Sequence, residues 1–223
     1  MRWLKQALSG RLVRWWKPAL AVAQEADSAL PSVLEEAFAQ TPLLPDNARV
    51  TLYNALPEAQ RTVALAPLAV LVAEALLQSG ALDEAARAAR LTNLGLRLSA
   101  LGQREAALQA TEEAVGLYRP LAEAQPDAFL PDLAGSLWTH GDSLTAMDDR
   151  KDDAVEAYGE ALTHLVPLAR QHPNDFRGQV RGTWADLQAA RLPGTSLSPS
   201  VACACHELVA LGLLDSSDAT EAR

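Results

Sequence analysis

The chain of 223 residues has little cysteine, few aromatic side chains and no long apolar run. Its two cysteines, Cys203 and Cys205, lie two positions apart and cannot form a disulfide framework, so we expect a reducing, cytoplasmic location. The longest apolar run, LAVLVA at 68–73, is far shorter than a membrane span. Ala and Leu dominate the 49% of apolar residues and aromatic residues make up only 5%, which favours helices over strands.

Acidic residues outnumber basic ones, but the two are unevenly distributed. The net charge is −9, yet residues 1–17 carry five basic residues and no acidic one. The remaining 206 residues therefore carry 14 basic and 28 acidic residues, a net charge of −14. A body this acidic repels phosphate backbones, so nucleic acid is not an expected partner.

The basic segment at 2–20 also carries leucines and tryptophans at helical spacing. Three uses are open for it: packing as the first helix of its own domain, gripping another protein, or lying on a membrane surface. The apolar stretch after Lys17, PALAVA, is too short for a secretory signal. Because Lys5 and Arg11 blur the apolar face, we expect residues 1–20 to dock on the acidic body, and membrane contact is not favoured.

One phrase occurs twice in the chain. PLAEAQPDAF at 120–129 and PLARQHPNDF at 167–176 share five of ten positions at a spacing of 47 residues. Upstream, LTNLGLRLSALGQREAAL aligns with LWTHGDSLTAMDDRKDDAV, and a weaker third copy begins at Phe176. Apolar positions in each copy follow the helical period, and Gly102 is placed to end the first helix. Each unit is therefore predicted to be a pair of helices that buries its apolar faces by stacking on the next unit.

Prolines recur at equivalent places in the two copies. Pro126 and Pro173 are predicted to stop the second helix of their units. Pro120 and Pro167 fall inside that helix and each removes a backbone donor, so a kink is expected at both.

The residues of these copies resemble the tetratricopeptide repeat (TPR). The TPR pattern has a large residue, a leucine, a small residue and a large residue in its first helix, then an alanine and an aromatic residue in its second. Thr111 replaces the aromatic residue in one copy and His140 replaces the leucine in the other, and the period is 46–47 rather than 34 residues. The matching positions are Leu91, Leu94, Gly95, Leu98 and Ala107 in the first copy, and Leu137, Gly141, Leu144, Ala154 and Tyr158 in the second. The resemblance is to the long-period, kinesin-light-chain type of TPR, which occurs in bacterial multidomain proteins beside NTPase or protease modules.

We therefore predict an all-α, right-handed α-solenoid of TPR-like helical hairpins with an N-terminal helical cap. Residues 1–80 form the cap, with helices at about 20–29, 31–40, 47–56 and 58–79. Residues 81–214 hold the repeats, at about 82–128, 129–175 and a divergent copy at 176–214. After a loop at 192–200 the last helix spans 200–214, and residues 215–223 form a flexible tail.

Two strings resemble catalytic or metal motifs but lack their context. GDSLT at 141–145 is similar to the nucleophile motif of GDSL-type esterases, with Ser143 as the nucleophile. That chemistry needs a strand-to-helix turn, whereas the preceding LAGSLWTH has a helical pattern, and no histidine has an aspartate three positions before it. CACHE at 203–207 lacks the four ligands of a zinc site, and its cysteines are expected to be buried apolar residues. No catalytic, cofactor-binding or metal-binding residue is predicted.

The resemblance implies a non-catalytic scaffold or adaptor that binds a protein or peptide partner on its concave surface. A regulatory or sensor segment of a larger NTPase- or protease-linked assembly is the alternative, and self-association into a homo-oligomer is also open. An exposed Trp138 would anchor a partner, whereas in the competing interpretation it packs between helices. The concave face is expected to present Thr92, Asn93, Leu96 and Ser99 from one unit, and Trp138, Thr139 and Asp142 from the next.

Overall fold

The computed structural model describes residues 30–39, 45–56, 65–147, 149–192 and 196–215. These residues form α-helices joined by short connections, and no strand occurs among them. The all-α prediction is therefore confirmed for this part of the chain. The predicted helix at 20–29, the basic segment at 1–20 and the tail at 216–223 lie outside the described residues.

The chain divides into two compact units, residues 1–103 and 104–223. The division falls between the two helices of the first predicted hairpin, 82–128, rather than at residue 80. We call the two parts unit 1 and unit 2 and describe each by itself.

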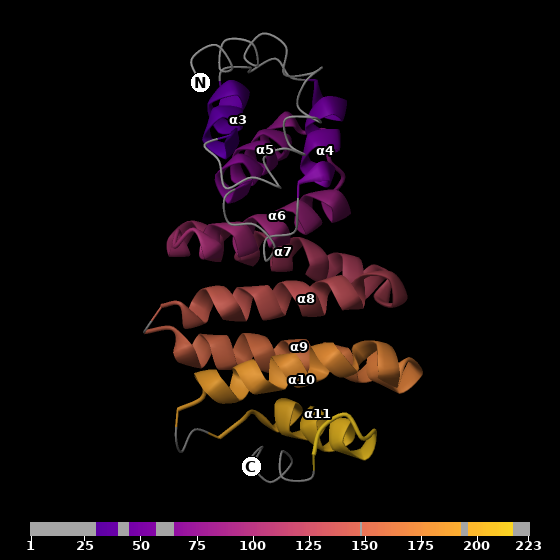
Figure 1. The fold of residues 1–223 in the computed structure, drawn as a ribbon. Helices are drawn as coiled ribbons and strands as arrows, with labels where there is room; N and C mark the ends of the chain where they lie inside the picture. Colours follow the sequence, from indigo (N-terminus) through magenta and orange to yellow (C-terminus); the bar gives the residue numbers. More distant parts are fainter. Residues whose placement is uncertain (1–29, 40–44, 57–64, 148, 193–195, 216–223) are drawn as a thin grey trace. The chain divides into compact units, whose positions relative to one another are not determined.

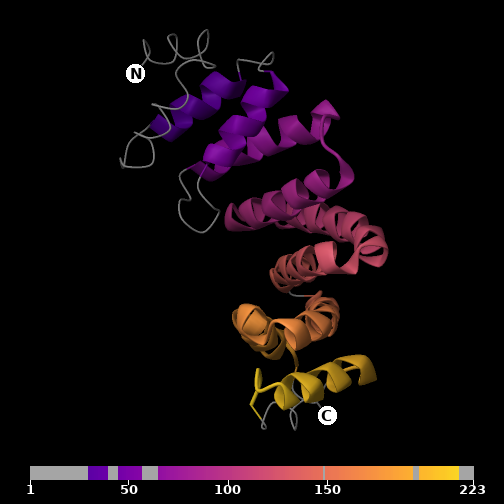
Figure 2. The same cartoon turned by 90° about the vertical axis from the view of Figure 1, so that its right-hand side faces the viewer.

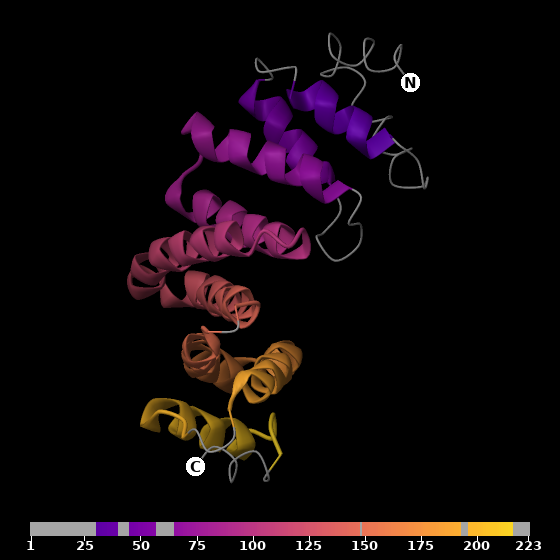
Figure 3. The ribbon, with the colours of Figure 1, turned by 90° about the vertical axis from the view of Figure 1, so that its left-hand side faces the viewer.

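Unit 1 is built around one apolar helix, α5 (Ala66–Ser79). Three helices pack against it (Figures 1 and 3), namely α3 (Leu30–Ala39), α4 (Asp46–Ala55) and α6 (Glu84–Ala100). The buried residues of α5 form one wide apolar face: Ala66, Leu68, Ala69, Val70, Val72, Ala73 and Leu76. The helices predicted at 31–40 and 47–56 are confirmed to within one residue, while α5 begins at Ala66, inside the predicted 58–79.

α6 has a clear signal at each end. The Asp83 carboxylate accepts a hydrogen bond from the backbone N–H of Ala86 at 2.7 Å, which is the usual contact of an N-cap. At the other end Gly102 adopts a left-handed φ of 73°, and the N–H of Gln103 donates to the carbonyl of Leu98 at 2.9 Å. The prediction that Gly102 ends this helix is confirmed.

Unit 2 contains α7 (Arg104–Ala124), α8 (Pro126–Thr145), α9 (Lys151–Gln171), α10 (Pro173–Ala190) and α11 (Pro199–Ala210). α8 packs against both α7 and α9, and α9 also contacts α10 and α11. Figures 1 and 2 show these helices following one another in chain order. Large side chains from three of them form much of the core of the unit: Tyr158, Leu162 and Leu165 of α9, Leu187 of α10 and Leu208 of α11.

The helices of unit 2 recur at a constant interval of 47 residues. α7 and α9 are each 21 residues long, and their first and last residues lie 47 positions apart. α8 and α10 also begin 47 positions apart, each with a proline as its first residue. The interval extends to α11, since three buried positions of α7 recur in α9 and α11: Ala107, Ala154 and Val201; Ala110, Ala157 and Ala204; Ala114, Ala161 and Leu208. The third copy, which is visible in the sequence only around Val180 and Trp184, therefore keeps the same register through its second helix.

The prolines of the repeated phrase begin helices. α7 and α9 end at Ala124 and Gln171, and Pro126 and Pro173 occupy the first position of α8 and α10. A proline costs no hydrogen bond there, because the N–H of the first helical residue has no partner within the helix. The prediction that these prolines stop the preceding helix is confirmed, since α7 and α9 end two residues before them, and each proline also begins the next helix. Pro120 and Pro167 do lie inside α7 and α9, which continue past them, and the kinks expected there remain predictions.

Candidate functional site

The residues predicted to line a concave surface belong to the two different units. Thr92, Asn93, Leu96 and Ser99 lie on α6 of unit 1, and Trp138, Thr139 and Asp142 lie on α8 of unit 2. On α6, Asn93 is exposed and the other three are half-buried. The side chains of Thr92 and Asn93 donate to the backbone carbonyls of Ala88 and Ala89, at 3.1 and 2.9 Å.

The indole of Trp138 takes part in the packing of unit 2. The side chain is half-buried against the core, and its Nε1 donates a hydrogen bond to Oδ2 of Asp186 on α10 at 2.7 Å. This geometry favours the interpretation in which Trp138 packs between helices. Thr139 is only 2% exposed, and its hydroxyl donates to the carbonyl of Gly135. The prediction that Thr139 faces a partner is wrong, because the packing of the neighbouring helices on α8 covers that side chain.

Asp142 is also engaged within the unit. The hydroxyl of Tyr158 on α9 donates to Oδ1 of Asp142 at 2.7 Å. Burial raises the pKa of the Asp142 carboxyl, and the nearby Asp186 raises it further, whereas the hydrogen bond from Tyr158 opposes the rise. Asp142 and Trp138 thus join α8 to α9 and α10, because the indole N–H of Trp138 and Oδ1 of Asp142 have hydrogen-bond partners on those helices.

The two strings that resemble catalytic and metal motifs lie on helices. Ser143 lies in the last turn of α8 and is only 1% exposed. Its hydroxyl donates to the carbonyl of Thr139 at 3.0 Å. This is not the exposed strand-to-helix turn of an esterase nucleophile. On α11, Cys205 is buried but Cys203 is exposed, so the expectation of two buried cysteines is wrong for Cys203. Residues two apart on a helix point to different sides.

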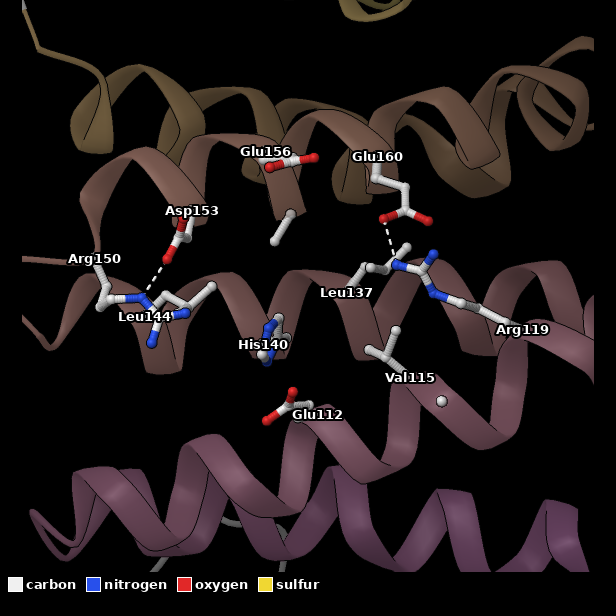
Figure 4. A pocket seen from close by; sticks show the side chains of 12 residues that line it. Glu112, Val115, Arg119, Leu137, His140, Leu144, Arg150, Asp153, Glu156 and Glu160 are labelled. Atoms are coloured by element: carbon white, nitrogen blue, oxygen red, sulfur yellow. Dashed lines mark hydrogen bonds and ion pairs between the residues drawn. The ribbon is translucent and has the colours of Figure 1, made fainter.

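A cavity of about 410 Å³ opens over α8, between α7 and α9 (Figure 4). All of it lies within unit 2. Its apolar lining consists of Val115, Leu137, Leu144 and Ala157 with the backbone of Gly116. Its charged and polar lining consists of Glu112 and Arg119 from α7, His140 from α8, Arg150 just before α9, and Asp153, Glu156 and Glu160 from α9. We call this the α8 cavity. No continuous motif marks these charged residues in the sequence, because they lie on α7, on α9 and just before α9.

Ion pairs hold both arginines of the α8 cavity. Arg119 contacts Glu160 at 2.8 Å and thereby links α7 to α9, and Arg150 pairs with Asp153 at the start of α9. A hydrogen bond from His164 and the charge of Arg119 hold the pKa of the Glu160 carboxyl below its usual range. Both pairs are partly open to solvent, so each contributes little to stability. Their main effect is to fix where positive charge lies at the rim.

His140 lies at the centre of the α8 cavity. Its Nδ1 is 3.0 Å from the hydroxyl of Thr111 on α7, and Thr111 itself is fully buried. Burial lowers the pKa of the imidazole, and this effect exceeds the opposite effect of the negative charge on Glu112. The ring is therefore neutral at neutral pH. Thr111 and His140 are the two positions where the copies depart from the TPR pattern. The structure shows that these two departures contact each other, whereas in the sequence each is visible only as a separate departure from the pattern.

Two further carboxylates line the α8 cavity and take no part in its ion pairs. Among the described residues, neither Glu112 nor Glu156 has a hydrogen-bond or ion-pair partner. Figure 4 shows Glu112 pointing from α7 towards His140, with Glu156 projecting from α9 on the other side of the ring. The cavity therefore combines an apolar floor, a neutral imidazole and two unpaired carboxylates. Chemically, this arrangement suits a ligand with a positive charge on an apolar stem.

A second hollow of about 550 Å³ lies on the other side of α9, against the start of α11. It shares Glu156 and Glu160 with the α8 cavity, and its remaining lining is mostly hydroxyl and apolar side chains from α9 and residues 196–201. Among the described residues, no group of three or more His, Cys, Asp or Glu side chains is placed to hold a metal ion. None of the helices that the structure describes is long and apolar enough to cross a membrane.

Comparison of the chain with protein-family models, with curated proteins and with solved structures gives no match.

Proposed function

We propose that the chain is a non-catalytic TPR-like scaffold, a right-handed solenoid that binds a protein or peptide partner. The observation that supports this most is the 47-residue interval of α7, α9 and α11, with the same buried positions in each helix. A repeat of this kind buries each helix pair on the next and leaves an extended surface with regularly spaced side chains. Such surfaces are suited to an elongated partner segment.

The binding surface that we propose is the α8 cavity. On the opposite side of α8, Trp138 and Asp142 already have hydrogen-bond partners within unit 2, and Thr139 is buried. The α8 cavity is open, combines apolar and charged side chains from α7, α8 and α9, and keeps two carboxylates without partners. A partner can therefore gain contacts there without first breaking contacts of the scaffold.

The test is selection of short peptides from a random pool on the immobilised full chain, followed by titration calorimetry of the enriched peptides. We expect saturable, one-to-one binding that is lost when the protein is unfolded. Recovery of no enriched peptide by a correctly folded protein, as judged by its helical circular dichroism, would contradict the scaffold.

The non-catalytic part of the proposal makes its own prediction. Because the Ser143 hydroxyl is buried and donates to Thr139, we expect wild-type protein and Ser143→Ala to hydrolyse short acyl esters no faster than buffer does. Turnover that disappears in Ser143→Ala, with the fold intact, would instead support an esterase.

A further inference from the structure

We propose that the α8 cavity receives a lysine or arginine side chain of the partner segment, with its charged group between Glu112 and His140 and with Glu156 on the opposite rim. This inference rests on the proposed scaffold function and specifies what that scaffold recognises. The occupant is a basic residue of another polypeptide, held by charge and by the apolar walls of the cavity.

The charge of the cavity favours a cation. Four carboxylates and two guanidinium groups line it, so its net charge is −2 while His140 is neutral. The two arginines pair with Glu160 and Asp153, and Glu112 and Glu156 are left without an ion-pair partner among the described residues, although Glu112 acts on Arg150 and His140 through its charge. Glu112 and Glu156 are both exposed at the rim, and a basic side chain entering between them supplies positive charge and can form charge-assisted hydrogen bonds with them.

His140 adds a directed acceptor to this charge. The Thr111 hydroxyl lies 3.1 Å from the carbonyl oxygen of Ala107 and 3.0 Å from that of Leu108, so its single proton is used by the backbone of α7. Its lone pair is then left for the N–H at Nδ1 of His140, 3.0 Å away. In that tautomer Nε2 carries no proton and accepts a hydrogen bond. A lysine ammonium or an arginine guanidinium has only donors, and both fit an acceptor beside a carboxylate.

The apolar residues of the cavity suit the stem of a basic side chain. Val115, Leu137, Leu144 and Ala157 are all buried in the helix packing and form the floor below the charged rim. The methylene groups of lysine and arginine lie on surfaces of this kind while their charged ends stay near water. A small inorganic cation would leave this floor uncovered, which favours a side chain over a free ion.

The test uses the peptides enriched on the full chain and compares four proteins, namely the wild type, Glu112→Gln, Glu156→Gln and Glu123→Gln. Glu112→Gln removes one of the two unpaired charges. Glu123→Gln is the matched control, because Glu123 is exposed on the same face of α7, about 16 Å further along the helix, and does not line the cavity. Each peptide is also made with its basic residue replaced by norleucine, which keeps an apolar stem and lacks the charge. Affinities are measured by fluorescence anisotropy.

We expect a basic residue at one fixed position of the enriched peptides. Its replacement by norleucine should weaken binding at least about tenfold to the wild type and to Glu123→Gln, and much less to Glu112→Gln. Glu156→Gln should behave like Glu112→Gln, which guards against a local effect of one substitution. The inference is overturned if the enriched peptides lack a basic residue, or if norleucine weakens binding equally in all proteins. In both cases peptides still bind, so the scaffold itself stands.

If no peptide is enriched, the scaffold proposal fails together with this inference. If the wild-type protein self-associates and Glu112→Gln makes it monomeric, the occupant is a second copy of this chain, and the proposed partner peptide is wrong.

Discussion

A β-carbon on Gly141 would lie 2.5 Å from Cε1 of Tyr158, closer than such atoms approach one another in proteins. Gly141 of α8 therefore lets the ring of Tyr158 on α9 lie directly on the helix backbone, and Tyr158 is 1% exposed there. The small residue of the first helix and the aromatic residue of the second are thus in contact across the hairpin. This pairing gives a physical reason for the two positions to occur together in one repeat.

Replacement of Gly141 by alanine should destabilise the protein. The methyl group meets the Tyr158 ring, which cannot move within the packed core, and we expect a loss of about 1–3 kcal/mol in the free energy of unfolding. Gly135→Ala on the same helix is the control, because its nearest neighbour would be Nε2 of Gln179 at 3.9 Å. There the better helix propensity of alanine should stabilise by up to about 1 kcal/mol. Urea denaturation of both variants measures these changes in the free energy of unfolding. Equal changes for Gly141→Ala and Gly135→Ala would contradict the contact between Gly141 and Tyr158.

Asp142→Asn should stabilise the protein at neutral pH. Burial and Asp186 raise the pKa of the Asp142 carboxyl in the folded state, so its ionised form is disfavoured by folding. Stability that depends on the protonated acid is present at low pH and is lost as the pH rises through the folded-state pKa. Asparagine keeps an oxygen for the hydroxyl of Tyr158 but carries no charge. The gain should therefore be seen at pH 7 and should shrink at low pH, when thermal unfolding is compared across pH; a loss at pH 7 would show that the charge is needed.

His140→Leu should remove part of the acid sensitivity of the fold. Burial lowers the pKa of His140 in the folded state, so the unfolded chain takes up a proton first as the pH falls below about 6.5. The charges that surround the ring are Glu112 and Arg119 of α7, Arg150, and Asp153 of α9, and none cancels the effect of burial. The wild type should lose stability between about pH 7 and pH 5, and the leucine variant should lose less. If chemical denaturation shows that both proteins lose the same unfolding free energy between pH 7 and pH 5, a buried neutral His140 is contradicted.

The helices and their register could largely be predicted from the sequence. The apolar period and the end signal at Gly102 act within a few residues, and the 47-residue interval of the repeated phrase reappears in α7 and α9. Pro126 and Pro173 were expected to stop one helix, which they do, and the structure adds that each is the first residue of the next helix.

The cavity could not be predicted in the same way. Whether Trp138 and Asp142 face solvent depends on where Asp186 and Tyr158 of other helices come to lie, and this is decided by helix rotation and packing. The contact of Thr111 with His140 joins residues 29 positions apart on different helices. Each of them is a departure from the TPR pattern, but only the structure shows that they form one site.

The most direct test of the scaffold and its cavity is an exchange of charges between protein and peptide. Glu112→Lys should abolish binding of a selected peptide that carries a basic residue, because like charges then meet in the α8 cavity. Replacement of that basic residue by glutamate should restore binding to Glu112→Lys and weaken binding to the wild type, as measured by titration calorimetry of all four combinations. Binding of the exchanged pair that is no stronger than that of either mismatched pair would contradict the account.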